Sequence, residues 1–138
     1  MAFTDNYRRQ HDEILDLAGQ LAANLTADKI KTNTDTVLNL LSQFSAKLNI
    51  HLTMEDKALY PKLLASSDKK ISETAASFQN EMGGIKQVVE KYIGNWCSKA
   101  NLLADPQKFI TDTNGLLGAL KARVDKENTI LYPMADKF

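Results

Sequence analysis

The sequence lacks a second cysteine, a net charge and a long apolar run, and each absence narrows the class of protein. Its one cysteine, Cys97, cannot form a disulfide within the chain, so a reducing compartment is the simpler expectation. Seventeen basic residues balance seventeen acidic ones, which argues against nucleic acid or an anionic membrane as the main partner. The sequence also contains no apolar run of transmembrane length and no signal-type segment near its start. We therefore expect a cytoplasmic protein.

The composition is that of an ordinary globular protein, with 43% hydrophobic and 25% charged residues. A chain of 138 residues is most simply one domain, and it is long enough to bury a substantial core. We expect a single domain over residues 1–138.

Apolar residues recur every three or four positions along four segments, which predicts four amphipathic helices. Thr34 or Asp35 is the expected cap of the second helix, and Pro106 the expected first residue of the fourth. Because short connections join long helices, antiparallel neighbours are favoured, and we predict an all-α, up-down-up-down four-helix bundle. The predicted helices cover residues 6–25, 34–65, 70–103 and the region after 105.

A segment that starts at Leu48 recurs in altered form 72 residues later, at Leu120. Both copies contain a glutamate followed by the tripeptide Leu-Tyr-Pro, at residues 59–61 and 131–133. We expect the two tyrosines to pack at the end of the bundle and the two prolines to kink or end their helices.

The two copies differ four residues before the glutamate. His51 precedes Glu55, whereas Arg123 precedes Glu127. A His and a Glu four residues apart share one helix face, where together they can hold a metal ion. An Arg cannot be a ligand, because it has no lone pair to give. Ligand chemistry is therefore retained in the first copy and altered in the second.

Heights along the predicted helices place several polar residues in about one layer of the bundle, all on inward stripes. Ionised groups are rarely buried without partners, so these residues require an explanation. They are His11, His51, Met82 and Arg123, with Glu55 and Glu127 one turn away.

His11, the His51-x-x-x-Glu55 pair before Leu-Tyr-Pro, and Glu127 before the second Leu-Tyr-Pro resemble the hemerythrin-like, or HHE cation-binding, domain. The resemblance covers about residues 7–133. It implies a four-helix bundle around a non-haem di-iron centre, held by one His from each odd helix and a His-x-x-x-Glu pair from each even helix. The two glutamates bridge the irons. Such centres bind oxygen or nitric oxide, store or sense iron, or serve redox roles.

The sequence departs from this pattern at two positions. Met82 stands where the third helix would supply a His, and Arg123 where the fourth would. Two His and a carboxylate suit ferrous iron with open positions, or zinc. We therefore expect iron at a reduced or mononuclear site that binds or senses a small diatomic ligand. The metal ligands implied by the resemblance are His11, His51, Glu55 and Glu127.

Arg123 leaves a second interpretation open. Its fixed positive charge can pair with Glu55, Glu127 or both, and so replace the second metal electrostatically. That would leave either a mononuclear site or a metal-free, salt-bridged core, in which case the bundle is an interaction or regulatory module. Alternatively, Arg123 extends from the edge of its stripe to solvent. An iron-dependent oxidase or repair protein has little support, since no catalytic residue or substrate pocket is indicated.

One further feature concerns the third predicted helix. Gly83 and Gly84 lie inside it, although each glycine costs about 1 kcal/mol there relative to alanine. We expect them to allow close approach of the first helix near His11, or a small cavity beside Met82.

Overall fold

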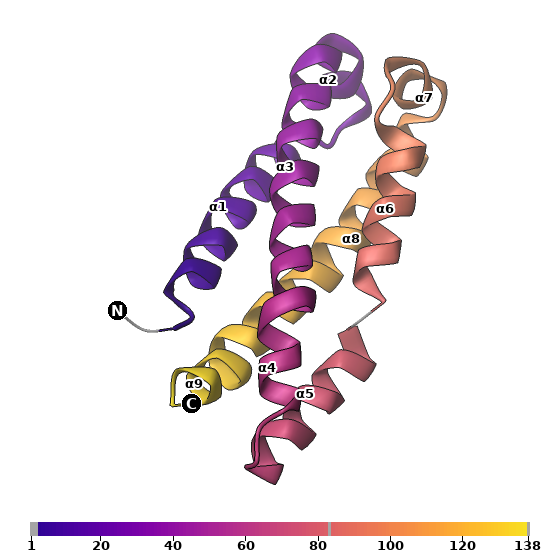
Figure 1. Ribbon diagram of the computed structural model, residues 1–138. Coiled ribbons are helices and arrows are strands. Elements are labelled where there is room, and N and C mark those ends of the chain that lie inside the picture. The colour runs from indigo at the N-terminus through magenta and orange to yellow at the C-terminus, as the bar shows by residue number, and fades with distance from the viewer. Residues whose placement is uncertain (1–2, 83, 138) are drawn as a thin grey trace.

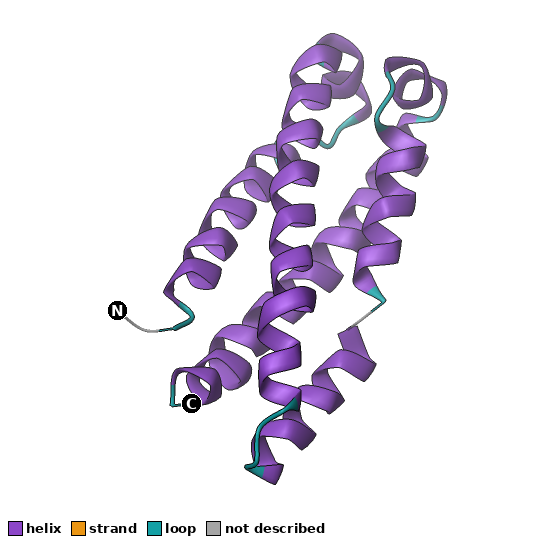
Figure 2. Cartoon of the chain, viewed as in Figure 1, coloured by secondary structure: helices purple, strands orange, loops and turns teal. Residues whose placement is uncertain are grey.

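The structure is a computed structural model that describes residues 3–82 and 84–137, without the side chain of Met82. The regular elements of this part of the chain are all helices, joined by short loops (Figure 2). They are α1 (Asp5–Ala22), α2 (Ala27–Thr32), α3 (Thr34–Met54), α4 (Tyr60–Leu64), α5 (Lys69–Met82), α6 (Ile85–Trp96), α7 (Lys99–Ala104), α8 (Pro106–Lys126) and α9 (Tyr132–Asp136), with π-helical turns η1 (Glu55–Leu59) and η2 (Glu127–Leu131).

The long helices form a bundle of four antiparallel arms (Figure 1). The arms are α1, then α3 continued by α4, then α5 followed by α6, and finally α8 continued by α9. Contacts of α1 with α3, α3 with α6, α6 with α8, and α8 with α1 close the ring. The short helices α2 and α7 lie together at one end. The predicted all-α fold is confirmed, and none of the described helices has the length and apolarity needed to span a membrane.

The third predicted helix is not continuous. It divides into α5, α6 and α7. The break between α6 and α7 occurs because Cys97 leaves the helical region with ψ of 39° and the Ser98 side chain caps α7 by accepting from the backbone N–H of Asn101. A Cβ built on Gly84 would meet no atom within 4 Å, so a close approach to α1 is wrong for this glycine. The expectations for Gly83 and the Met82 side chain lie outside the described residues.

Smaller boundary errors have similar local causes. The first helix ends at Ala22 rather than near residue 25, and Thr26 caps the separate helix α2. The cap of α3 is Asn33, not Thr34 or Asp35. The predicted start of the fourth helix at Pro106 is confirmed, with the Asp105 side chain accepting from the backbone N–H of Lys108 at 3.1 Å.

The two Leu-Tyr-Pro prolines do not end their helices, which continue to Leu64 and Asp136. A proline has no N–H to donate to the carbonyl four residues earlier, and its ring crowds that carbonyl. In both copies the turn before the proline is a π-helical turn instead, closed by the backbone N–H of Tyr60 or Tyr132 bonding to the carbonyl of the glutamate five residues earlier. Each glutamate therefore opens a widened turn.

Two apolar clusters form the core. The larger one fills the end near α2 and α7 and extends along α3 and α8 to Leu52 and Val124. The smaller one surrounds the Leu-Tyr-Pro segments and includes Leu59 and Leu131. The turns η1 and η2 lie between these limits on their arms, so their glutamates enter the interior between two apolar regions.

Candidate metal centre

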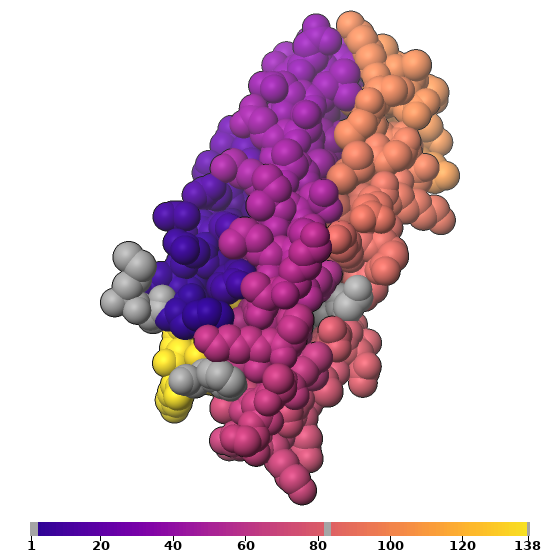
Figure 3. All heavy atoms as spheres, in the orientation of Figure 1, coloured from indigo at the N-terminus to yellow at the C-terminus, as the bar shows by residue number. Residues whose placement is uncertain are grey.

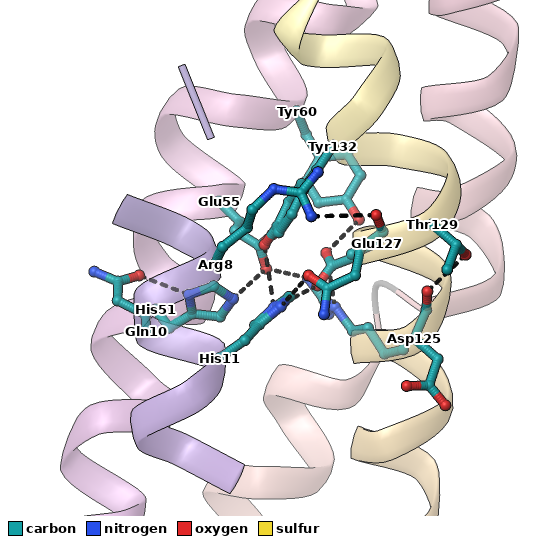
Figure 4. A network of polar contacts seen from close by, with 12 residues as sticks. Arg8, Gln10, His11, His51, Glu55, Tyr60, Asp125, Glu127, Thr129 and Tyr132 are labelled. Carbon is teal, nitrogen blue, oxygen red and sulfur yellow. Dashed lines mark hydrogen bonds and ion pairs between the residues drawn. The ribbon is translucent and has the colours of Figure 1, made fainter. Parts of the chain in front are cut away.

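Five ionisable side chains converge between the two apolar clusters, with exposed fractions between 0% and 4%. Four of them can supply metal ligands, and one ligand atom from each lies within 4.8 Å of the others. Figure 4 shows how they approach from α1, α3 and the two π-helical turns. The structure therefore brings together the whole predicted ligand set, together with the arginine of the second copy. The five residues, called the polar cluster below, are His11, His51, Glu55, Arg123 and Glu127.

His51 is held as a neutral imidazole with its Nε2 lone pair directed inward. Its Nδ1 lies 2.6 Å from Gln10 Oε1, and because an amide oxygen only accepts, Nδ1 carries the proton. Gln10 Nε2 donates to Met54 Sδ, which supports this orientation of the amide. Burial, with the charge of His11, lowers the pKa of His51 to about 3. At neutral pH its Nε2 therefore carries no proton.

The buried Nε2 atom of His51 has no hydrogen-bond partner. It lies 3.0 Å from Glu55 Oε1, yet it makes no hydrogen bond with good geometry. The two atoms are therefore close together but not aligned for a hydrogen bond. Ligand atoms bound at about 2.0–2.2 Å to one ion lie roughly 3 Å apart, so this pair has the spacing of two ligands of a common metal.

His11, like His51, has an amide oxygen beside Nδ1 and a carboxylate oxygen beside Nε2. Its Nδ1 lies 2.9 Å from Asn128 Oδ1, and its Nε2 lies 3.1 Å from Glu127 Oε1. Burial acts to lower the pKa of His11, but the hydrogen bond and charge of Glu127 outweigh it and raise the pKa. Burial and the charge of Glu55 also raise the pKa of the Glu127 carboxyl. The His11–Glu127 pair therefore retains a shared proton in the metal-free protein.

Arg123 joins the two glutamates. Its Nη2 lies 3.2 Å from Glu55 Oε1, and its Nε lies 3.3 Å from Glu127 Oε2. Burial alone would lower the pKa of the guanidinium, but the two carboxylates raise it, so Arg123 stays charged. Arg123 was expected to pair with Glu55, Glu127 or both, and the structure shows both pairs. Its extension to solvent is wrong, since its side chain is 4% exposed.

The two Leu-Tyr-Pro tyrosines also belong to the site, which the sequence did not indicate. Tyr132 donates to Glu55 Oε2 at 2.7 Å, and Tyr60 donates to Glu127 Oε2 at 3.2 Å. Each tyrosine thus bonds the glutamate of the other copy. Burial and the nearby carboxylates raise the pKa of both phenols, so they remain protonated donors. They lie in the smaller apolar cluster, as expected for packing at that end, but their hydroxyls reach the polar cluster.

The four carboxylate oxygens are divided between two sides. Both Oε1 atoms lie beside an imidazole Nε2, that of His51 or His11. Both Oε2 atoms accept from a phenol, and Glu127 Oε2 also accepts from Arg123. On the imidazole side the atoms form a set of two nitrogens and two oxygens, which fits one ion. On the other side, phenol protons take both Oε2 atoms. Arg123 spans the two sides, because its Nε donates to Glu127 Oε2 and its Nη2 donates to Glu55 Oε1.

The amide partners of the two imidazoles were also missed by sequence reasoning. Gln10 precedes His11 along the chain but bonds His51, and Asn128 follows Glu127 but bonds His11. An acceptor that fixes the remote ring N–H is the usual outer support of a His ligand. Neither residue has a signature in the sequence, because each partner lies on another arm.

The chain was compared with known families, proteins and structures. The family model of the hemerythrin HHE cation-binding domain matches residues 2–135, which is nearly the whole chain. No curated protein and no solved structure matches it.

Proposed function

The chain belongs to the hemerythrin HHE cation-binding family, and from this premise we propose that it binds a single non-haem metal ion. The proposed ligands are His11, His51, Glu55 and Glu127, and Arg123 takes the place of a second metal. The proposed metal is iron, which this mixture of imidazole and carboxylate ligands suits, with zinc as the main competitor.

The proposal rests on the Nε2 atom of His51, which is buried and makes no hydrogen bond. Gln10 fixes its tautomer, and burial keeps it neutral. Glu55 Oε1 lies 3.0 Å away but makes no hydrogen bond with it. A buried polar atom without a hydrogen bond costs about 1–3 kcal/mol. A cation between the imidazole and the carboxylate would satisfy both lone pairs at once.

The proposed ligand of the metal is a small diatomic molecule such as oxygen or nitric oxide. A bound ferrous ion supplies the reversible ligand binding, and this chain's own residues set its surroundings. Apolar clusters border the site on both sides. Tyr60 and Tyr132 hold the carboxylates in place, and Arg123 keeps a positive charge beside them. We propose a binder or sensor rather than an enzyme.

Metal analysis tests the proposal. Protein purified without a chelator or a metal-affinity tag, then loaded anaerobically with ferrous iron, should retain about one equivalent after desalting. The matched control is His51→Gln, which removes the ligand nitrogen with little change in volume and should retain well below half as much. Less than about a tenth of an equivalent of iron, zinc or manganese in the wild-type protein would overturn the proposal.

A metal-free interaction or regulatory module is the second candidate, and the bridging position of Arg123 favours it. Arg123 and the proton shared by His11 and Glu127 balance the two carboxylates without an ion. In that case the loaded and unloaded proteins would have the same unfolding midpoint. If the first candidate is correct, a tightly bound metal should raise the midpoint, because it binds the folded state alone.

A further inference from the structure

The two ends of the described chain are fastened together beside α1. Asp136 Oδ1 accepts from the backbone N–H of Thr4 at 2.9 Å and from its hydroxyl at 2.7 Å. Thr4 is the N-cap of α1, makes no capping bond with its own side chain and is fully buried. The carboxylate of α9 therefore caps α1, where the helix dipole favours a negative charge. Figures 1 and 3 show the two terminal segments side by side.

Arg8 connects this Thr4–Asp136 clamp to the polar cluster. Its Nε donates to Thr4 Oγ1 at 3.2 Å, and its Nη2 lies 3.7 Å from Asp136 Oδ2. Its Nη1 donates to the backbone carbonyl of Asn128 at 3.3 Å, and its Cζ lies 5.4 Å from the centre of the Tyr132 ring. The guanidinium thus contacts three neighbours through its nitrogens and a fourth through the face of its plane. A planar, forked group such as arginine can make all four contacts at once.

Asn128 and Tyr132 are two of the residues that hold the His11 ring, beside Glu127. Asn128 Oδ1 lies 2.9 Å from His11 Nδ1, and the Tyr132 ring stacks on the imidazole at 5.1 Å with 21° between the planes. The Tyr132 hydroxyl also lies 3.1 Å from His11 Nε2. Arg8 therefore contacts Asn128 and Tyr132, while it is itself bonded to Thr4 at the start of the helix that carries His11.

We propose that Arg8, held by the Thr4–Asp136 clamp, is a positioning residue that orients the His11 imidazole through Asn128 and Tyr132. The effect of Arg8 on metal affinity rests on the proposed function, whereas its effect on the orientation of the His11 ring does not. Without Arg8, the η2 backbone at Asn128 and the Tyr132 ring lose their shared support, and His11 Nδ1 loses its fixed acceptor.

The first test uses metal-free protein, so that it does not depend on metal binding. The chain contains two histidines, and their imidazole ¹⁵N resonances can be told apart with His51→Gln. In Arg8→Gln, the His11 resonances should move toward values averaged over both tautomers, while those of His51 stay in place. The matched control is Arg9→Gln, since Arg9 is exposed and pairs with Glu13 at 3.7 Å. It should leave both histidines unchanged.

The second measurement is iron affinity with urea unfolding recorded beside it. Arg8→Gln should weaken iron binding on the order of tenfold, as loss of an outer support of a ligand does, and Arg9→Gln should not. If Arg8→Gln lowers stability but leaves the His11 resonances unchanged, the residue is merely structural and the proposal is overturned. If the resonances shift but no variant binds metal, the positioning role stands and the proposed function fails.

A second variant covers the case in which Arg8→Gln does not fold. Asp136→Asn keeps Arg8 but weakens the clamp by removing a charge that Thr4 and Arg8 both contact. The His11 resonances should shift in the same direction by a smaller amount. Unchanged His11 resonances in a folded Asp136→Asn protein would equally contradict the proposal.

Discussion

The hydroxyl of Tyr132 donates to Glu55 across 77 residues of sequence, at 2.7 Å. Tyr60 makes the reciprocal bond to Glu127, so each copy of the repeat supplies a phenol to the carboxylate of the other. This exchange leaves the Oε1 atom of each glutamate beside an imidazole. The tyrosine of Leu-Tyr-Pro is therefore part of the candidate metal centre and not only of the apolar core.

Removal of a single hydroxyl tests this relationship. Tyr132→Phe should cost about 1–3 kcal/mol of unfolding free energy, because Glu55 Oε2 loses a buried donor. It should also weaken iron binding by roughly tenfold to a hundredfold. Urea unfolding and a metal competition titration measure the two effects.

Tyr92→Phe is the control for Tyr132→Phe. Tyr92 is also buried, and its hydroxyl bonds Thr113 at 2.6 Å, away from the polar cluster. This variant should lose stability but keep its iron affinity. Equal losses of affinity in both variants would show that the Tyr132 effect is a general consequence of destabilisation.

Arg123→Ala should remove the cation between the two buried carboxylates. We expect a loss of about 3–5 kcal/mol in the metal-free protein, since the substitution leaves negative charge buried without its partner. Thermal or urea unfolding measures it. Lys126→Ala, which breaks an exposed ion pair with Glu81, should cost less than about 1 kcal/mol. A loss for Arg123→Ala as small as that of the control contradicts a buried pairing role.

The neutral state of His51 predicts a pH dependence of stability in the metal-free protein. Its folded pKa of about 3 lies below the unfolded value of about 6.5. Between these values the unfolded chain binds a proton that the folded protein does not, so stability falls as the pH falls. Relative to His51→Gln, the wild-type protein should lose on the order of 3 kcal/mol between pH 6.5 and pH 4.

The measurement is a series of urea unfolding curves for both proteins in the presence of a chelator. Most other acid effects are shared by the two proteins and cancel in the difference. A difference that stays constant over this pH range would mean that His51 is already protonated in the folded state.

Restoring the family pattern tests the second half of the site. Met82→His combined with Arg123→His should raise the iron content from about one to about two equivalents and add the near-ultraviolet absorption of an oxo-bridged pair. Arg123→His alone is the control and should remain near one equivalent. A double variant that folds but gains no metal would show that position 82 does not face the polar cluster.

Much of the site could be predicted from local sequence. His51 and Glu55 lie four residues apart, and helical geometry alone puts them on one face. The position of His11 at the same height follows from helix length. The repeat placed Glu127 near the same height, and the resemblance to the family added its role as a metal ligand. Gln10, Asn128 and the two tyrosine hydroxyls could not be found this way, because their hydrogen-bond partners lie on other arms, 117 residues away in the case of His11 and Asn128.

The sequence by itself determined the four amphipathic arms, the retained His-Glu pair of the first copy and the arginine of the second. These follow from periodicity and residue chemistry, which act over a few residues. Only the tertiary structure decided that Arg123 joins both glutamates and that the phenols exchange partners. It also decided that one imidazole nitrogen remains without a hydrogen bond. Such relationships depend on the height and rotation of each arm against its neighbours, which packing of the two apolar clusters sets.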